Sequence, residues 1–239
     1  LRHLAEKADV RVDEVVGADL EVVDLQPPAL GGVNEELLFS PRIDNLAGCH
    51  ALLDALIRSD RSQRRTRIIA LFDSEEIGSQ TSGGAGSSFL DSVLERICLT
   101  HAQPREAWHR ALAHSMLISV DGAHAVHPSY ADFHDPHHRP ILNGGPVLKI
   151  NAQQRYATNA STRCWFEYCA RRAGVPLQYY VHRTDLPCGS TIGPMTATRL
   201  GVPVVDVGSP MLSMHSIRET GGVEDQHRMI QVLMEHFSN

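Results

Sequence analysis

Two apolar runs that each end near an acidic residue constrain the fold of this chain more than any other feature. IIALFD covers residues 68–73 and MLISVDG covers 116–122, and both have the length and composition of buried strands. Comparable runs occupy 144–151, 177–183 and 202–208. Because helical patterns separate these runs, the sequence predicts an α/β fold with a mostly parallel sheet.

The helical patterns have recognisable ends. Apolar residues recur at helical spacing over 43–56, after Ser40-Pro41, and the amphipathic segment 159–174 ends at a glycine, as helices often do. Further helices are expected over 89–99, 191–201 and 223–237. The first 27 residues begin with a helical pattern and continue into LEVVDLQPP, which predicts a strand that ends at Pro27-Pro28.

Composition excludes several classes of protein. A chain of 239 residues with 42% hydrophobic content can bury one sizeable core. The net charge of -6 is spread along the sequence without a basic stripe, so no nucleic-acid partner is expected. No apolar run is long enough to span a membrane, so no membrane partner is expected either. Five cysteines without a C-x-x-C pair favour a reducing, cytoplasmic location.

Acidic residues follow the expected strands, where α/β sheets form their sites. Glu75 and Glu76 are adjacent, so one carboxylate can bind a metal while the other faces a reacting water. Taken singly, each candidate has a simpler interpretation. The glutamate pair could be a solvated turn, Asp44 a helix N-cap, Asp121 a turn acid, and His215 a hydrogen-bonded histidine among apolar neighbours. Together these acids and the histidine suit zinc, manganese or cobalt in a catalytic site.

Six segments resemble one known family in order and spacing. They are SPRIDNLAG, LFDSEEIGSQTSGGAGSSFL, ISVDGAHAVHPSY, LNGGPVLKINAQQRYATN, DLPCGSTIGP and VDVGSPMLSMHSIRE, and they span roughly residues 20–220. With these motifs the chain resembles the M18 aspartyl aminopeptidases of the co-catalytic zinc exopeptidase clan. The resemblance implies a mixed, mostly parallel sheet flanked by helices, and two zinc ions per subunit, with manganese or cobalt as substitutes.

The resemblance also implies a role for each candidate. Asp44 corresponds to the carboxylate that bridges the two metals, and Glu75 to the general base. Glu76 and His215 correspond to further ligands of one metal, and Asp121 to a ligand of the other.

The family removes acidic N-terminal residues from peptides, so the resemblance implies a cation facing the first side chain of the substrate. Lys149 is the position that it indicates. An alternative for Lys149 is a strand-edge lysine with its ammonium group in solvent. His124, Asp185, Gly189 and Thr191 correspond to positions that line the substrate.

The chain departs from the family pattern in its N-terminal part. None of the 14 histidines has an aspartate two positions later, so the His-x-Asp element that supplies a ligand of the second metal is missing. The resemblance makes residues 1–27 the tail of an inserted β-rich oligomerisation lobe and residues 28–239 the catalytic domain without its N-terminal part. It implies a homo-oligomer, built from dimers or extending to a dodecamer. We expect the 239-residue chain alone to bind the second zinc poorly and to be nearly inactive.

Two other functions remain open from the sequence. One is a different two-metal amidohydrolase or aminopeptidase, and the other is an inactive assembly subunit. Serine catalysis is disfavoured because no G-x-S-x-G motif occurs, and Cys188 lies in a glycine turn without a basic partner.

Overall fold

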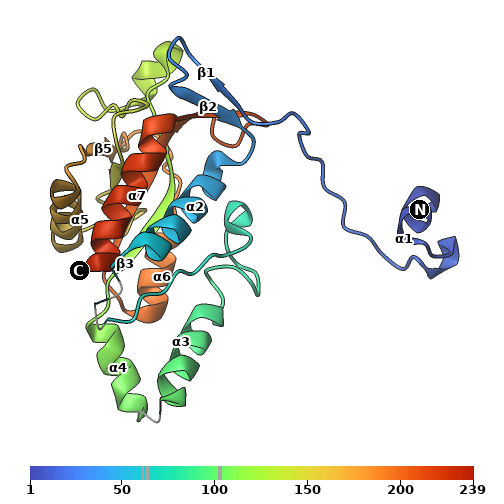
Figure 1. Ribbon diagram of the computed structural model, residues 1–239, viewed down its shortest axis with the longest axis horizontal. Coiled ribbons are helices and arrows are strands. Elements are labelled where there is room, and N and C mark those ends of the chain that lie inside the picture. Colours follow the sequence, from blue (N-terminus) through green and yellow to red (C-terminus); the bar gives the residue numbers. More distant parts are fainter. Residues whose placement is uncertain (61, 63–64, 102–103) are drawn as a thin grey trace.

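Seven strands form one sheet, in which six follow the order β1-β2-β7-β6-β4-β5 and β3 pairs with β6 (Figure 1). The computed structural model describes residues 1–60, 62, 65–101 and 104–239. The strands are β1 (Ala29–Gly31), β2 (Leu37–Ser40), β3 (Leu117–His124), β4 (Val147–Ile150), β5 (Gln178–Val181), β6 (Val204–Leu212) and β7 (Glu219–Gly222).

The sheet is mixed and flanked by helices, as expected, but parallel pairing does not dominate it. The pairs β3–β6 and β4–β5 are parallel, whereas β1–β2, β2–β7, β4–β6 and β6–β7 are antiparallel. Three of the four antiparallel pairs involve β1, β2 or β7, short strands that the apolar runs of the sequence did not mark. The long pair β3–β6, in register from Leu117 with Val204 to His124 with Met211, forms the parallel centre.

Every expected helix is present, and α4 is an additional one. The helices are α1 (Arg2–Ala8), α2 (Ile43–Arg58), α3 (Phe89–Thr100), α4 (Arg105–Ala113), α5 (Ala160–Ala173), α6 (Ile192–Leu200) and α7 (Val223–Ser238). At α5 the Asn159 side chain accepts a hydrogen bond from the Thr162 amide, and Gly174 ends the helix in the left-handed conformation. The glycine was recognised in the sequence as the end of this helix.

The two faces of the central strands serve different purposes. Val205 and Val207 of β6 and Leu148 of β4 face a core that also contains Phe166 of α5 and Met229 of α7. Helices α2, α5 and α7 cover this face (Figure 1). Because side chains alternate along a strand, Asp206 and Lys149 face the opposite side. A methyl group on Gly193 of α6 would collide with the Asp206 carboxylate, which places α6 on that side.

Two expected strands are absent. The sequence pattern predicted strands at residues 20–28 and 68–73. Neither segment pairs with another strand in the described part of the chain. The prediction was wrong because an apolar run creates a strand only when another strand accepts its backbone hydrogen bonds. Ile68 and Leu71 remain about half exposed.

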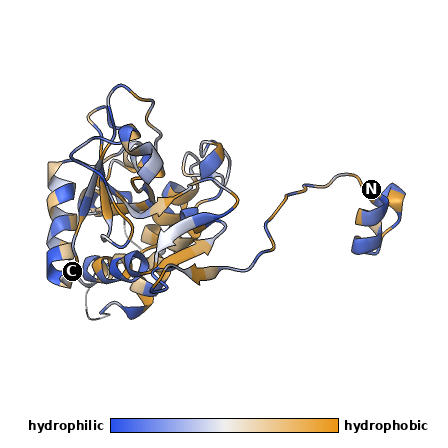
Figure 2. Ribbon diagram, turned by 90° about the horizontal axis from the view of Figure 1, so that it is seen from above, coloured by the Kyte–Doolittle hydropathy of each residue, from blue (hydrophilic) through white to orange (hydrophobic). Residues whose placement is uncertain are grey.

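The N-terminal segment extends away from the rest of the chain (Figures 1 and 2). It contains α1 and a 3-10 helix at Val12–Glu14, and it joins the sheet at β1. Arg218 holds its end by donating hydrogen bonds to the Gln26 and Pro27 carbonyls and pairing with Asp24. Figure 2 shows apolar residues in this segment, outside the packed body. Val16 and Val22, which belong to the segment, are almost fully exposed.

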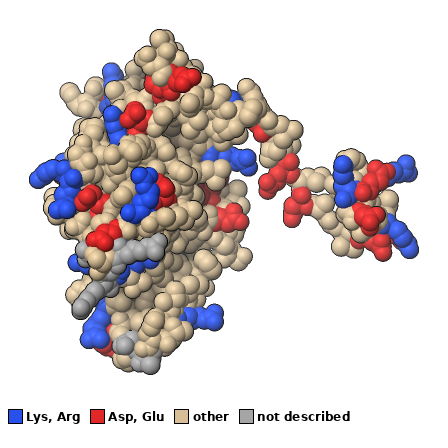
Figure 3. All heavy atoms as spheres, viewed as in Figure 1, with Lys and Arg blue, Asp and Glu red and all other residues tan. Residues whose placement is uncertain are grey.

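Acidic and basic side chains are interspersed over the face shown in Figure 3, including the N-terminal segment. Among the described residues, no helix has both the length and the apolar character required to cross a membrane.

Candidate metal centre

Residues from four separate parts of the chain meet at the ends of the central strands. Asp44 lies in the first turn of α2, and Glu75 and Glu76 begin a 3-10 helix that ends at Ile77. Asp121 lies in β3, and His215 lies in the turn between β6 and β7. Ser74 and Gly78 flank the glutamate pair in the left-handed conformation, so the backbone reverses sharply there.

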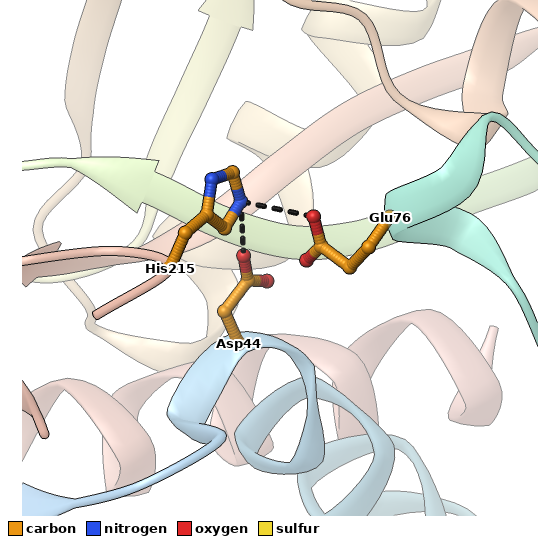
Figure 4. Close-up of side chains that lie close together, drawn as sticks. All are labelled: Asp44, Glu76 and His215. Atoms are coloured by element: carbon orange, nitrogen blue, oxygen red, sulfur yellow. Dashed lines mark ion pairs between the residues drawn. The ribbon is translucent and has the colours of Figure 1, made fainter. Parts of the chain in front are cut away.

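Asp44, Glu76 and His215 form a cluster of potential metal ligands (Figure 4). The Nε2 atom of His215 lies 3.3 Å from Oδ2 of Asp44 and 3.1 Å from Oε2 of Glu76. One ligand atom from each residue lies within 4.8 Å of the others. The Asp44 side chain is 4% exposed, whereas the His215 side chain is 60% exposed, so the cluster has one buried wall and one open side.

The charges at this site raise the pKa values of two acids. Burial raises the pKa of Asp44 to about 8, and the nearby Asp121 and Glu76 carboxylates add to the rise. Burial also raises the pKa of Glu75 to about 7, again with contributions from Asp121 and Glu76. Carboxyl groups crowded in this way are stabilised by a cation.

Lys149 supplies one positive charge. Its Nζ atom lies 2.9 Å from Oδ2 of Asp121, with both side chains mostly buried. Burial opposes ionisation of Asp121, but Lys149 and the hydrogen bond from Asp44 hold its pKa below the usual value. The alternative of a solvated strand-edge lysine is therefore wrong, because Lys149 is 3% exposed.

A cavity of about 320 Å³ opens over the cluster. Its lining includes Glu75, Asp121, His124, Lys149, Gly189 and Thr191. Burial, and then the charge of Lys149, lower the pKa of His124 to about 4, so its imidazole is neutral near pH 7.

Asp185 is not brought to this cavity. Its carboxylate is exposed and pairs with the Arg183 guanidinium. The other nine residues that the sequence indicated all line the cavity.

Sequence reasoning missed three further residues around the cavity. The ring of Tyr156 lies 5.5 Å from the Lys149 ammonium, and Tyr156 lines the cavity. Asp206 is fully buried and accepts hydrogen bonds from the Thr191 hydroxyl and the Ala157 amide, each 2.6 Å long. An acid inside the apolar run VPVVDVG could have indicated Asp206, since such a group needs buried partners.

The third missed residue is Glu219, at the start of β7, and it is 2% exposed. Its two oxygens accept hydrogen bonds from the amides of Asp44 and His215. No local pattern marked this glutamate, because its partners are distant in the sequence or belong to a turn whose shape the sequence does not reveal.

The residues at the site fit a divalent metal ion. The Oδ1 atom of Asp44 is buried and has no hydrogen-bond partner, which is costly for a carboxylate oxygen unless a cation neutralises it. Two carboxylates and an imidazole are ordinary ligands of catalytic zinc. Within the described ranges this is the one group of three such residues, so the described chain offers one set of three potential metal ligands.

The fold and the site together define a class: an α/β protein with a carboxylate–histidine metal centre at the strand ends. A sequence model of the family described as "Aminopeptidase I zinc metalloprotease (M18)" matches residues 1–237. The chain belongs to the M18 aminopeptidase family.

Individual relatives agree with this assignment. The chain is 44% identical over 237 residues to a probable M18 family aminopeptidase 2 of Ectopseudomonas mendocina, covering 99% of this chain and 54% of the relative. It is 48% identical over 230 residues to the Mycobacterium tuberculosis protein of that description, covering 93% of this chain and 53% of the relative. Among solved structures, the S. cerevisiae mApe1 dodecamer matches with a TM-score of 0.85 and 32% identity, covering 99% of this chain and 53% of that one. The chain thus spans about half the length of the relatives it matches.

Proposed function

We propose that the protein is a metallo-aminopeptidase that removes acidic N-terminal residues from peptides at a two-zinc site. The observation that carries this proposal is the cluster of Asp44, Glu76 and His215, which lies beside Glu75 in a cavity whose lining also includes Lys149.

Asp44, Glu76 and His215 would hold one metal. Asp121, which lines the same cavity, would join Asp44 as part of the ligand set of a second metal. Bound zinc would supply Lewis-acid polarisation of the scissile carbonyl and acidify a water molecule. Glu75 lies next to this cluster and is not needed as a ligand. In the proposal it accepts the proton of the attacking water and returns it to the leaving amine.

Acidic specificity is assigned to Lys149. Lys149 is among the residues that line the cavity, and its ammonium group contacts the Asp121 carboxylate and the Tyr156 ring. A substrate Asp or Glu side chain that reaches it would form a second charge-assisted contact. His124 is neutral near pH 7, so it can hydrogen-bond to the substrate without adding charge. Gly189 and Thr191 also line the cavity and are assigned to substrate binding.

The assembly belongs to the proposal as well. The S. cerevisiae relative forms a dodecamer, which supports a homo-oligomer for this protein. The exposed apolar residues of the N-terminal segment support its role as part of an oligomerisation lobe. We place the protein in the cytoplasm, consistent with its unpaired cysteines in the described chain.

The test uses the protein as its own cells produce it, rather than the 239-residue chain made alone, and a panel of aminoacyl substrates. We expect faster cleavage of Asp and Glu substrates than of neutral ones. Glu75→Gln should abolish turnover and leave the zinc stoichiometry unchanged, whereas Glu21→Gln, at an exposed position outside the cavity, should change neither.

Other results would indicate another function. A preference for neutral N-terminal residues would point to a different two-metal aminopeptidase or amidohydrolase. Zinc binding without any turnover would point to an inactive assembly subunit. Loss of zinc in Glu75→Gln would mean that the two glutamates have exchanged roles.

A further inference from the structure

Glu219 connects two of the three potential metal ligands through their backbones. Its Oε2 atom accepts a hydrogen bond of 3.0 Å from the Asp44 amide, and its Oε1 atom accepts one of 2.8 Å from the His215 amide. Since each oxygen has its own partner and the residue is 2% exposed, the carboxylate fixes the separation of these two backbone segments.

The sheet places Glu219 where it can do this. Strands β2 and β7 are antiparallel, and Ser40, the last residue of β2, pairs with Glu219, the first residue of β7. The segment that leads to Asp44 therefore leaves the sheet beside the turn that arrives from His215. Without a connection between them, the two segments would be free to move apart above the end of the strand pair.

The backbone at His215 needs such support. His215 has a φ of 66° and Ser213 a φ of 58°, a left-handed conformation that side chains other than glycine adopt at a cost. The turn is closed by a hydrogen bond from the Ser216 amide to the Ser213 carbonyl. The hydrogen bonds to Glu219 tie the backbone of this turn to the backbone at Asp44, in addition to the contact between the His215 and Asp44 side chains.

We infer that Glu219 is a positioning residue that sets the spacing of Asp44 and His215 for metal binding. The inference rests on the metal site of the proposed function and assigns no contact between Glu219 and the metal. An amide cannot replace the carboxylate, because glutamine offers one acceptor oxygen and would turn its NH₂ group toward the second backbone N–H.

The chain offers a matched control. Asp225 at the start of α7 is also a buried carboxylate, 1% exposed, and accepts hydrogen bonds from the Asn143 and Gly145 amides at 2.6 and 2.8 Å. It does not line the cavity. Glu219→Gln and Asp225→Asn therefore remove the same kind of interaction from two different places.

The experiment measures zinc binding by the chelator-treated 239-residue chain in competition with a chromophoric chelator. The His215→Ala variant measures the background zinc binding by other histidines and by cysteines, and the remainder is the His215-dependent binding. We expect Glu219→Gln to weaken the His215-dependent zinc site about 10- to 100-fold, the range seen when groups supporting metal ligands are removed. Asp225→Asn should stay within about twofold of the unsubstituted chain, although both variants lose hydrogen bonds of the same kind. With cobalt as the probe, the visible absorption spectrum of Glu219→Gln should also change and that of Asp225→Asn should not.

Four outcomes separate the possibilities. Equal zinc affinity of Glu219→Gln and the unsubstituted chain overturns the inference, as does an equal loss in both variants. Absence of any His215-dependent binding in the unsubstituted chain instead refutes the proposed metal site. If Glu219→Gln does not fold, Glu219→Asp decides, since it keeps two acceptor oxygens but withdraws them from the two amides. Wild-type affinity of Glu219→Asp would overturn the inference.

Discussion

The ion pair between Lys149 and Asp121 provides a quantitative test of the charge balance at the site. At 2.9 Å and an effective dielectric constant of about 20, the attraction between the two charges is about 6 kcal/mol. Desolvation of both groups offsets part of this. Removing one partner of a buried pair usually costs about 3–5 kcal/mol. The Asp121 side chain is 20% exposed, which favours the lower end of that range.

We therefore expect Lys149→Met to lower the free energy of unfolding by about 3 kcal/mol in the presence of a chelator. For a chain of this length, that corresponds to a fall in Tm of about 6–12 °C. The variant keeps an apolar side chain of similar length, so loss of packing contributes little. Thermal and urea unfolding followed by circular dichroism measure the change.

Two comparisons test whether the pair itself is responsible. Arg172 and Glu235 are also paired, at 2.8 Å, but the arginine side chain is about half exposed, so Arg172→Met should cost less than about 1 kcal/mol. Asp121→Asn combined with Lys149→Met should cost clearly less than the sum of the single changes, by about 2 kcal/mol. A cost of Lys149→Met below about 1 kcal/mol, or strict additivity in the double variant, would refute the reasoning.

Two further predictions concern the buried acids Asp225 and Asp206. Burial raises the pKa of Asp225 to about 6, above the unfolded value of 3.8, so its ionisation opposes folding as pH rises through this interval. Relative to Asp225→Asn, the unsubstituted chain should gain stability when the pH falls from 7 toward 4, by up to about 3 kcal/mol in urea titrations. A pH-independent difference would contradict this. Asp206→Asn should weaken the hydrogen bonds that hold Thr191 and Ala157 in place. In the protein as its own cells produce it, the substitution should therefore raise KM more than it lowers kcat. A fall in kcat alone would contradict a positioning role.

Local sequence patterns predicted much of the architecture. The apolar runs at β3, β4, β5 and β6, the helical patterns of α5 and α7 and the glycine that ends α5 were sufficient, because each reflects interactions within a few residues or the need to bury one face. The acids after the strand-like runs were recognisable because they stand within a few residues of those runs in the sequence. The predicted strands at 20–28 and 68–73 did not form among the described residues, since pairing depends on a partner that no local pattern encodes.

The sequence by itself determined which chemical groups the site contains: the Glu75–Glu76 pair, Asp44, Asp121 and His215 were all identifiable before any coordinates. Only the tertiary structure decided how they are held. It paired Lys149 with Asp121, left Asp185 outside the cavity, and placed the Glu219 carboxylate between the amides of Asp44 and His215. Asp44 and Glu219 are 175 positions apart. Contacts of this kind arise from strand register and the packing of distant segments, so no pattern of neighbouring residues can reveal them.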